Sequence, residues 1–182
     1  MRERIHRHVH GFWPGVHVND LQWDLGPVKE AIPDFHVCEV ERSAPGEPFV
    51  YVSAGASSAA TQPRVEFFLM AGMPDPLHVE ALALVAYFHA TWGGVDVGRV
   101  LDLGRPWCEG SALQHFLVSV PYPYGPAFEY MDSPDGPVRL LWLLPITQQE
   151  AEYAAREGYE GLEDLLEQHE VDFLDPARPS VV

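Results

Sequence analysis

The clearest pattern of apolar positions in the chain is the segment 138–144, VRLLWLL. Its unbroken apolar run has the length of a buried strand, and Pro145 is expected to end it. Side chains alternate between the two faces of a strand. We therefore expect Leu141 and Leu143 to lie on one face and Trp142 on the other.

The residues that follow this strand have the pattern of two amphipathic helices. Thr147 stands three residues before Glu150, which is the spacing of a capping box. We expect helices at residues 148–157 and 159–169, with Gly158 at a C-cap position between them. Helical spacing predicts that the buried stripe consists of Ala151, Ala154, Tyr159, Leu162, Leu165 and Leu166.

An earlier helix is marked by both of its ends. Asp75 is a suitable N-cap, Pro76 suits the first helical position, and the glycines at 93–94 are expected to end the helix. Between these ends, helical spacing predicts one apolar face made of Leu77, Ala81, Leu84, Phe88 and Trp92.

The remaining patterns are those of short strands and turns. Strands are expected at residues 35–41, 49–54, 64–71, 100–103, 115–120 and 128–131. The first two should form a hairpin, as should residues 128–131 with 138–144. We expect a short helix at residues 1–9, irregular chain at 17–33, turns at 43–48 and 133–136, a loop at 55–63, and no central strand at 121–126.

The order of these elements predicts the class of fold. Strands, one helix, more strands and a helical C-terminus are typical of an α+β fold. We expect a single domain over residues 1–182, with a mainly antiparallel mixed sheet flanked by helices.

Composition and charge narrow the function. A hydrophobic fraction of 47% over 182 residues is typical of a folded globular protein. Because 27 acidic residues outnumber 11 basic ones, for a net charge of −16, direct binding to nucleic acid is disfavoured and a cationic partner is favoured. Cys38 and Cys108 are too few for a disulfide scaffold, and no apolar run has the length of a signal peptide core or a membrane span, so a cytoplasmic protein is expected.

Three histidines near the start of the chain are the first candidates for chemistry. His6, His8 and His10 would share one face of a strand, while on a helix His6 and His10 would do so. Imidazole nitrogens bind zinc and nickel. Because no carboxylate or cysteine at ligand spacing accompanies them, we expect no metal site and no cofactor.

Ser57 is the second candidate. A hydrolase nucleophile elbow has the pattern Gly-x-Ser-x-Gly and leads into a helix. Here Ala59 replaces the last glycine and another strand follows, so a turn between strands is the preferred interpretation. We expect no catalytic residues.

Glu66 is unusual because it lies inside an apolar strand. An isolated buried carboxylate is costly, so we expect Glu66 to pair with an arginine or to cap a neighbouring loop.

Two segments are candidate contact surfaces for a partner. Residues 147–175 hold ten acidic residues and one arginine, and Glu160, Glu163 and Glu167 would form a docking face unless they only solvate the helices. In the segment PYPYGP, Tyr122 and Tyr124 are rigid amphipathic side chains of the kind enriched at interfaces, although they would equally pack over the sheet.

Three stretches together resemble one family. They are YVSAGAS followed by RVEF (residues 51–57 and 64–67), LGRPW with SVPYP (103–107 and 119–123), and LLPIT with the closing SVV (143–147 and 180–182). They are similar to the suppressor-of-fused-like domain family, especially its bacterial members, and the resemblance is best over residues 35–182.

The resemblance implies an α+β binding domain without established catalysis. Animal members bind a transcription factor through a short peptide, and bacterial members are thought to be immunity proteins that neutralise polymorphic toxins. Tyr51 matches a tyrosine of the animal peptide-binding region, and the matched strands add Ser53, Arg64 and Glu66 as contact candidates.

The sequence is therefore interpreted as a cytoplasmic, non-catalytic protein that sequesters a protein partner, such as a cationic toxin domain. It is expected to bind neither nucleic acid directly nor a membrane. One alternative is a hydrolase or metal-dependent enzyme that uses Ser57 or the N-terminal histidines. The other is a regulatory domain that binds a peptide or a small ligand.

Overall fold

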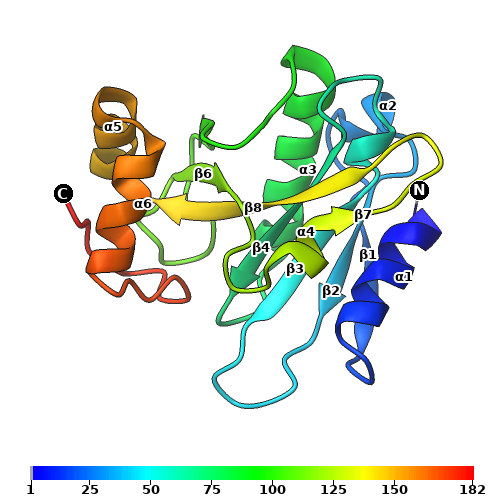
Figure 1. Ribbon diagram of the computed structural model, residues 1–182, viewed down its shortest axis with the longest axis horizontal. Helices are drawn as coiled ribbons and strands as arrows, with labels where there is room; N and C mark the ends of the chain where they lie inside the picture. Colours follow the sequence, from blue (N-terminus) through cyan, green and yellow to red (C-terminus); the bar gives the residue numbers. More distant parts are fainter. Residues whose placement is uncertain (1) are drawn as a thin grey trace.

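The fold is built on one eight-stranded mixed sheet (Figure 1). The computed structural model describes residues 2–182. The strand order is β1-β2-β3-β4-β8-β6-β5, and β7 also pairs with β8. The strands are β1 (Val18–Gln22), β2 (His36–Val40), β3 (Phe49–Ala54), β4 (Val65–Ala71), β5 (Val100–Asp102), β6 (His115–Ser119), β7 (Tyr130–Met131) and β8 (Val138–Ile146).

Pairing in this sheet is mainly antiparallel, as expected. Strands β4 and β8 run parallel, with Phe67 in register with Leu141, and the other described pairs are antiparallel. A parallel pair needs a long crossover. Here the chain between β4 and β8 supplies α3 and strands β5 to β7. The expected α+β class is confirmed.

Helices cover both faces of the sheet. They are α1 (Arg2–Phe12), α2 (Val28–Ala31), the 3-10 turn η1 (Ala56–Ser58), α3 (Pro76–Trp92), α4 (Pro126–Glu129), α5 (Gln148–Glu157) and α6 (Tyr159–Gln168). In Figure 1, α1 and the pair α5–α6 lie at opposite ends of the molecule. No helix within residues 2–182 is both long enough and apolar enough to pass through a membrane.

Strand β8 separates two apolar cores, as its alternation predicts. Leu141 and Leu143 belong to the core that contains residues of α3. Trp142 belongs to the other core, which contains residues of α1, α5 and α6. A strand buried on both faces is expected to be continuously apolar. This arrangement explains the sequence LLWLL.

The beginning and end of α5 follow the sequence prediction. The Thr147 hydroxyl accepts a hydrogen bond from the Glu150 amide at 3.1 Å, and the Glu150 carboxylate accepts one from the Thr147 amide at 2.8 Å. Gly158, with φ 94°, follows the last residue of α5. Glycine adopts this left-handed conformation at little cost. The predicted capping box and C-cap are confirmed.

The expectation that Pro145 ends the strand is wrong. Strand β8 continues through Ile146, and Pro145 is in register with Phe116 of β6. On the other side of β8, the register with β4 ends at Trp142. Proline is tolerated here because this part of β8 has a neighbouring strand on one side only.

Three further boundaries differ from those expected. The segment 17–33 is not irregular throughout, because it contains β1 and α2. Helix α1 continues through Gly11 to Phe12 instead of ending before the glycine, and the first residue of that prediction lies outside the described part of the chain. Phe128 lies in the short helix α4, so only Tyr130 and Met131 form the predicted hairpin with β8.

The ends of α3 agree with the prediction, but its buried face does not. The Asp75 carboxylate accepts a hydrogen bond from the Leu77 amide at 2.9 Å, and Gly93 follows the last helical residue. Leu84 and Trp92 were expected on the buried face but are 43% and 77% exposed. Apolar residues lie on nearly every side of this helix, so spacing alone does not identify the face that meets the sheet. The buried residues are His78, Val79, Ala81, Leu82, Ala83, Val85, Ala86 and His89.

His78 makes the fold sensitive to acid. Its side chain is buried between the rings of Tyr51 and Trp107, at centroid distances of 5.0 and 5.1 Å. Within residues 2–182 neither ring nitrogen has a hydrogen-bond partner. Burial lowers the pKa of His78 from 6.5 to about 4, although the charges of Asp75 and Glu39 oppose the shift. The neutral ring is therefore the form that the fold accommodates.

Replacing His78 should change how stability depends on pH. Because the folded pKa lies below the unfolded one, the unfolded chain takes up more protons as the pH falls from 6.5 to 4, and stability is lost over that window. At pH 4.5 the loss from this group should be about 2–3 kcal/mol. Urea unfolding at pH 7 and 4.5 should show a smaller acid loss for His78→Leu than for wild type. Equal losses would contradict this assignment, and His169→Leu, at an exposed position, is the control.

Candidate functional site

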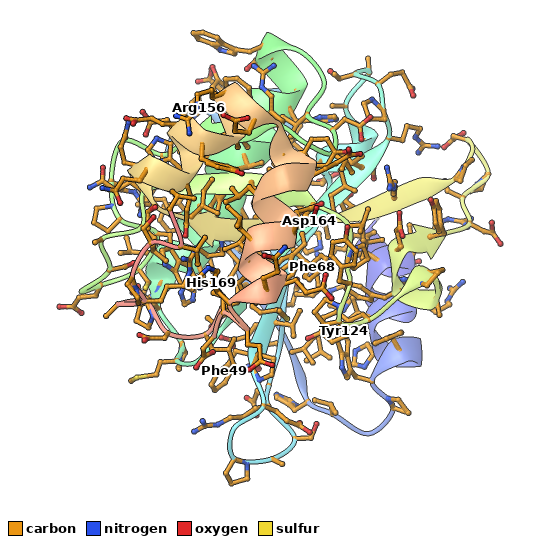
Figure 2. The ribbon with its side chains drawn as sticks, turned by 60° about the vertical axis from the view of Figure 1, so that its left-hand side comes forward. Phe49, Phe68, Tyr124, Arg156, Asp164 and His169 are labelled. Carbon is orange, nitrogen blue, oxygen red and sulfur yellow. The ribbon has the colours of Figure 1, made fainter. Side chains whose placement is uncertain are left out.

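A groove of about 690 Å³ beside α6 is the candidate functional site. We call it the acidic groove. Figure 2 shows α6, which carries Asp164, crossing in front of the sheet. The lining residues come from β6, the segment after it, β8, α6 and the chain beyond α6: Ser119, Tyr122, Pro123, Trp142, Leu144, Glu160, Glu163, Asp164, Leu166, Glu167 and Phe173.

The amphipathic pattern of α6 positions the acidic side of the groove. Leu162 and Leu166 are buried in the core, as the sequence predicts. Glu160, Asp164 and Glu167 are exposed on the same helix. Because residues three and four apart lie on one helical face, these carboxylates form a row along the groove.

Glu163 connects this helix to the opposite wall. Its carboxylate accepts hydrogen bonds from the Ser119 hydroxyl at 2.5 Å and the Tyr122 hydroxyl at 3.3 Å. Burial raises the pKa of Glu163 above its ordinary value, with further contributions from Glu160 and Asp164, while the two hydroxyl donors oppose the shift. Glu163 therefore holds the walls together, and its exposed neighbours supply the free negative charge.

Aromatic side chains form the apolar part of the groove. Trp142 packs edge-on against Phe173, with ring centroids 5.2 Å apart, and is stacked with Phe68 at 6.3 Å. The Trp142 indole nitrogen is buried and has no hydrogen-bond partner within residues 2–182. A buried donor without a partner costs free energy.

This combination suits an extended cationic segment of a protein. Carboxylates attract lysine or arginine side chains, and aromatic walls bury their aliphatic stems. None of these features requires a covalent reaction.

Four of the predicted contact residues meet in this groove. Tyr122, Glu160, Glu163 and Glu167 all line it, although they come from two separate segments. Tyr124 does not line it. Its ring packs with Trp13 and Phe128, with ring centroids 5.1 Å apart in each pair. Of the two roles considered for Tyr124, a partner contact or packing over the sheet, these contacts agree with the second.

The candidates taken from the family resemblance lie elsewhere. Tyr51 is 1% exposed in the core that contains α3 residues, so it lies on the other face of the sheet from Trp142. Its hydroxyl donates to Glu39 at 2.7 Å, and it lines a separate hollow of about 350 Å³. Arg64 donates to the backbone oxygens of Ser57 and Gly136. Tyr51 and Arg64 are therefore bound within the fold and away from the acidic groove.

Glu66 caps the loop after β3, which is one of its two expected roles. It is fully buried and accepts hydrogen bonds from the amides of Gly55, Ala56 and Ser57 at 3.0–3.1 Å. The hydroxyls of Ser53 and Ser57 each donate to it at 2.6 Å. Burial raises the pKa of Glu66, and these donors oppose the shift. The Ser57 hydroxyl is thus committed to the loop.

Sequence reasoning missed part of the groove. Ser119, Trp142 and Phe173 were not identified as site residues, although the alternation of β8 placed Trp142 on the correct face. Phe173 carries a weak signal, since it is an aromatic residue in a polar stretch beyond the last helix. Nothing local to Ser119 indicates that it meets Glu163, which is 44 positions away.

Comparison with protein families gives one match. The model for the family described as Suppressor of fused protein (SUFU) matches residues 34–179. No curated protein matches the chain.

Solved structures include similar chains. A SUFU (suppressor of fused protein) homolog from Neisseria gonorrhoeae FA 1090 is 37% identical and has a TM-score of 0.90, and the match covers 100% of this chain and 96% of that one. A chain in the Sufu–Fu complex is 16% identical, with a TM-score of 0.75 and coverage of 99% and 91%. Drosophila Suppressor of Fused is 18% identical, with a TM-score of 0.76, and the match covers 98% of this chain but 50% of that one. The latter two likenesses concern the fold.

Proposed function

The chain belongs to the suppressor of fused protein family, and from this premise we propose that it is a non-catalytic domain that binds a protein partner through the acidic groove. The observation that carries the proposal is the row of exposed carboxylates on α6 beside the aromatic side chains of Tyr122, Trp142 and Phe173. Desolvated aromatic residues commonly supply most of the binding energy at protein interfaces. Charged residues at the rim mainly set the association rate.

The partner that fits this groove is cationic. Arg156, the one arginine among residues 147–175, is paired with Glu157 at 2.8 Å. Within residues 2–182 it makes no ion pair with the carboxylates of Glu160, Asp164 or Glu167. A relative of the same fold has been crystallised as the Sufu–Fu complex, which supports a binding role. We further propose an immunity-type role in which the domain sequesters a basic toxin domain, because the net charge of −16 suits such a partner.

Binding through the groove is favoured over the other interpretations. Ser57 is 2% exposed and its hydroxyl donates to Glu66, which leaves a hydrolase without a free nucleophile. Tyr51 is bound to Glu39 within the core, so we assign the contacts to the groove instead. The groove follows about two turns of α6, from Glu160 to Glu167, and this extended row of carboxylates suits a peptide segment better than a compact small ligand.

Charge reversal on α6 tests this proposal. The variant Glu160→Lys/Asp164→Lys/Glu167→Lys should slow association with the partner about ten-fold or more at low salt, because steering depends on local charge. Added salt should reduce the difference, since it screens exposed charges. Glu163 stays unchanged because its carboxylate holds Ser119 and Tyr122. The measurement is surface-based kinetics at two salt concentrations with the protein partner that wild type captures from native extract.

A second triple variant controls for net charge. Glu30→Lys/Glu47→Lys/Asp132→Lys changes the charge by the same amount at exposed positions outside the groove. It should retain most of the wild-type association rate. Equal slowing by both triples, or association that does not change with salt, would reject the groove as the docking site. Unchanged unfolding curves would show that both variants are folded, as expected for exposed charges.

A further inference from the structure

Three potential metal ligands converge beside the N-terminal helix. His6 lies on α1, Asp20 on the edge strand β1 and His36 at the start of β2. The Oδ1 atom of Asp20 is 3.3 Å from His6 Nε2 and 3.7 Å from His36 Nε2. The three ligand atoms all lie within 4.8 Å of one another. Segments that are distant in sequence thus bring two imidazoles and a carboxylate to one point.

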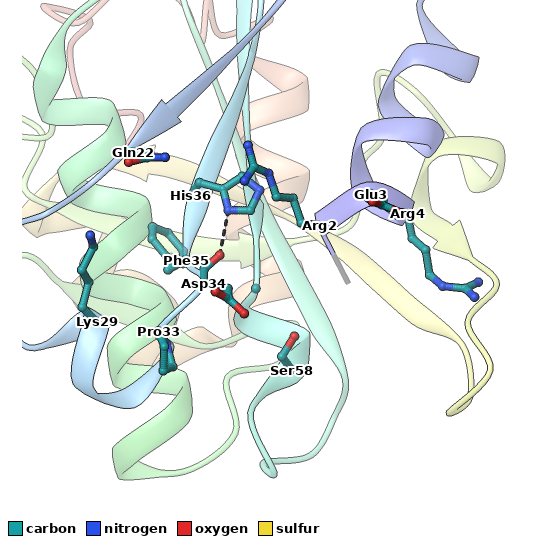
Figure 3. A pocket seen from close by; sticks show the side chains of 11 residues that line it. Arg2, Glu3, Arg4, Gln22, Lys29, Pro33, Asp34, Phe35, His36 and Ser58 are labelled. Atoms are coloured by element: carbon teal, nitrogen blue, oxygen red, sulfur yellow. Dashed lines mark hydrogen bonds between the residues drawn. The ribbon is translucent and has the colours of Figure 1, made fainter.

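His36 is held in the form that binds a metal. Its Nδ1 lies 2.7 Å from the backbone oxygen of Asp34, as the dashed line in Figure 3 shows, and must donate its proton there. The proton-free Nε2 therefore carries a lone pair. His36 is 3% exposed, and within residues 2–182 no group hydrogen-bonds to Nε2. Metal-bound histidines are commonly oriented by such a bond from the other nitrogen to a carbonyl.

We propose that His6 Nε2, Asp20 Oδ1 and His36 Nε2 bind a divalent transition-metal ion of the zinc type. Zinc takes imidazole nitrogens and carboxylate oxygens at about 2.0–2.2 Å, which places neighbouring ligands of a tetrahedron about 3.3 Å apart. The two carboxylate–imidazole separations, 3.3 and 3.7 Å, are close to this value, and the imidazole nitrogens lie within 4.8 Å of each other, so rotations of the side chains would bring the three ligands onto one ion. Two histidines and one carboxylate leave a fourth position for water or another ligand.

The electrostatics of the cluster agree with this assignment. Burial lowers the pKa of both His6 and His36, so the rings are neutral at physiological pH and available as ligands. Arg2 is the competing cation, since it pairs with Oδ2 of Asp20 and lies beside the His36 ring in Figure 3. The Arg2 side chain is 52% exposed and leaves Oδ1 facing the histidines.

This cluster differs from the set of three N-terminal histidines, His6, His8 and His10, that the sequence suggested as metal ligands. His10 stacks on His6 with ring centroids 6.1 Å apart, but it is not part of the cluster. The carboxylate that seemed to be missing is Asp20, which reaches the histidines from β1. A bound ion would fasten α1 to the edge of the sheet, and this consequence is independent of the acidic groove.

Titration of the untagged full chain with Zn²⁺ tests the proposal. Calorimetry should give one ion per chain, and Co²⁺ should give the visible absorption of a low-symmetry site. His36→Ala and Asp20→Asn should each weaken binding ten-fold or more. His10→Ala is the matched control and should change the affinity less than three-fold. Arg2→Gln should bind at least as tightly as wild type, because it removes the competing charge.

Several outcomes would overturn the proposal. They are the absence of stoichiometric binding, equal losses for His10→Ala and His36→Ala, and full affinity in Asp20→Asn. Unfolding curves without metal check that each variant is folded, and Asp20→Asn keeps the test decisive if His36→Ala fails to fold. Zn²⁺ should also raise the Tm of wild type and have no such effect on Asp20→Asn, because an ion that binds only the folded form stabilises it.

Discussion

Glu66→Ala should lower the free energy of unfolding by about 3 kcal/mol or more. The substitution removes the acceptor shared by three buried loop amides and by the hydroxyls of Ser53 and Ser57. A buried donor that loses its partner costs about 1–3 kcal/mol. Water that enters the new cavity would recover part of this cost, which is why the expected loss is smaller than the sum. Denaturant unfolding monitored by tryptophan fluorescence measures the change.

Glu66→Gln separates the hydrogen bonds from the effect of volume. An amide of the same size keeps one acceptor oxygen, which can still serve Gly55 and Ser57 on the Oε1 side. Its NH₂ group would face the Ala56 amide, another donor. Glu66→Gln should therefore lose about half as much stability as Glu66→Ala. A negligible loss in Glu66→Gln would show that the cavity, not the loop cap, dominates the cost of Glu66→Ala.

Local patterns predicted the elements whose signals lie within a few residues. The capping box of Thr147 and Glu150 and the alternation of β8 depend on neighbours in sequence, and the structure contains both. The extent of β8 depends on which strands flank it, so a local rule placed its end at Pro145 incorrectly. The buried face of α3 depends in the same way on how the helix meets the sheet.

The candidate sites show the same contrast between local sequence signals and contacts that only the fold creates. The exposed glutamates of α6 and Tyr122 each had a local signal, but only the fold brings them to one groove. Asp20 had no such signal, because residues 17–33 were expected to be irregular. Its strand pairs with β2 in a register that aligns Gln22 with His36, and this pairing brings the Asp20 carboxylate near two histidines. Without that register, the sequence gives no reason to place Asp20 beside the histidines.

Arg178→Met should cost about 3–5 kcal/mol of stability at pH 7, the range for a buried ion pair that loses one partner. The Arg178 guanidinium donates to both oxygens of Glu150, at 2.7 and 2.8 Å, and to the Pro145 carbonyl at 2.8 Å. Both side chains are buried. The pair holds the C-terminal segment against α5 and β8. Phe173, which lines the acidic groove, lies five residues before Arg178 in the same segment.

Arg178→Met should also change how the free energy of unfolding depends on pH. Burial alone would raise the pKa of Glu150, but hydrogen bonds from Arg178 and the amides of Thr147 and Val181 lower it overall. In wild type, the stabilisation from Glu150 is therefore present at neutral pH and is lost as the pH falls from about 4.5 through the lower folded pKa. Without Arg178 the burial effect dominates, and protonation of Glu150 relieves an unpaired buried charge. Acidification should then destabilise Arg178→Met less than wild type.

A double variant makes this test independent of lost packing. Arg178→Met/Glu150→Gln removes the unpaired charge and keeps an amide that can still accept from the Thr147 N–H. At pH 7 the double variant should be more stable than Arg178→Met alone, because neutralising an unpaired buried carboxylate recovers desolvation energy. Urea unfolding at pH 7 and pH 4 compares the three proteins. If the double variant is no more stable than the single one at pH 7, the cost of Arg178→Met comes from lost packing, and the ion pair is not what holds this end of the chain in place.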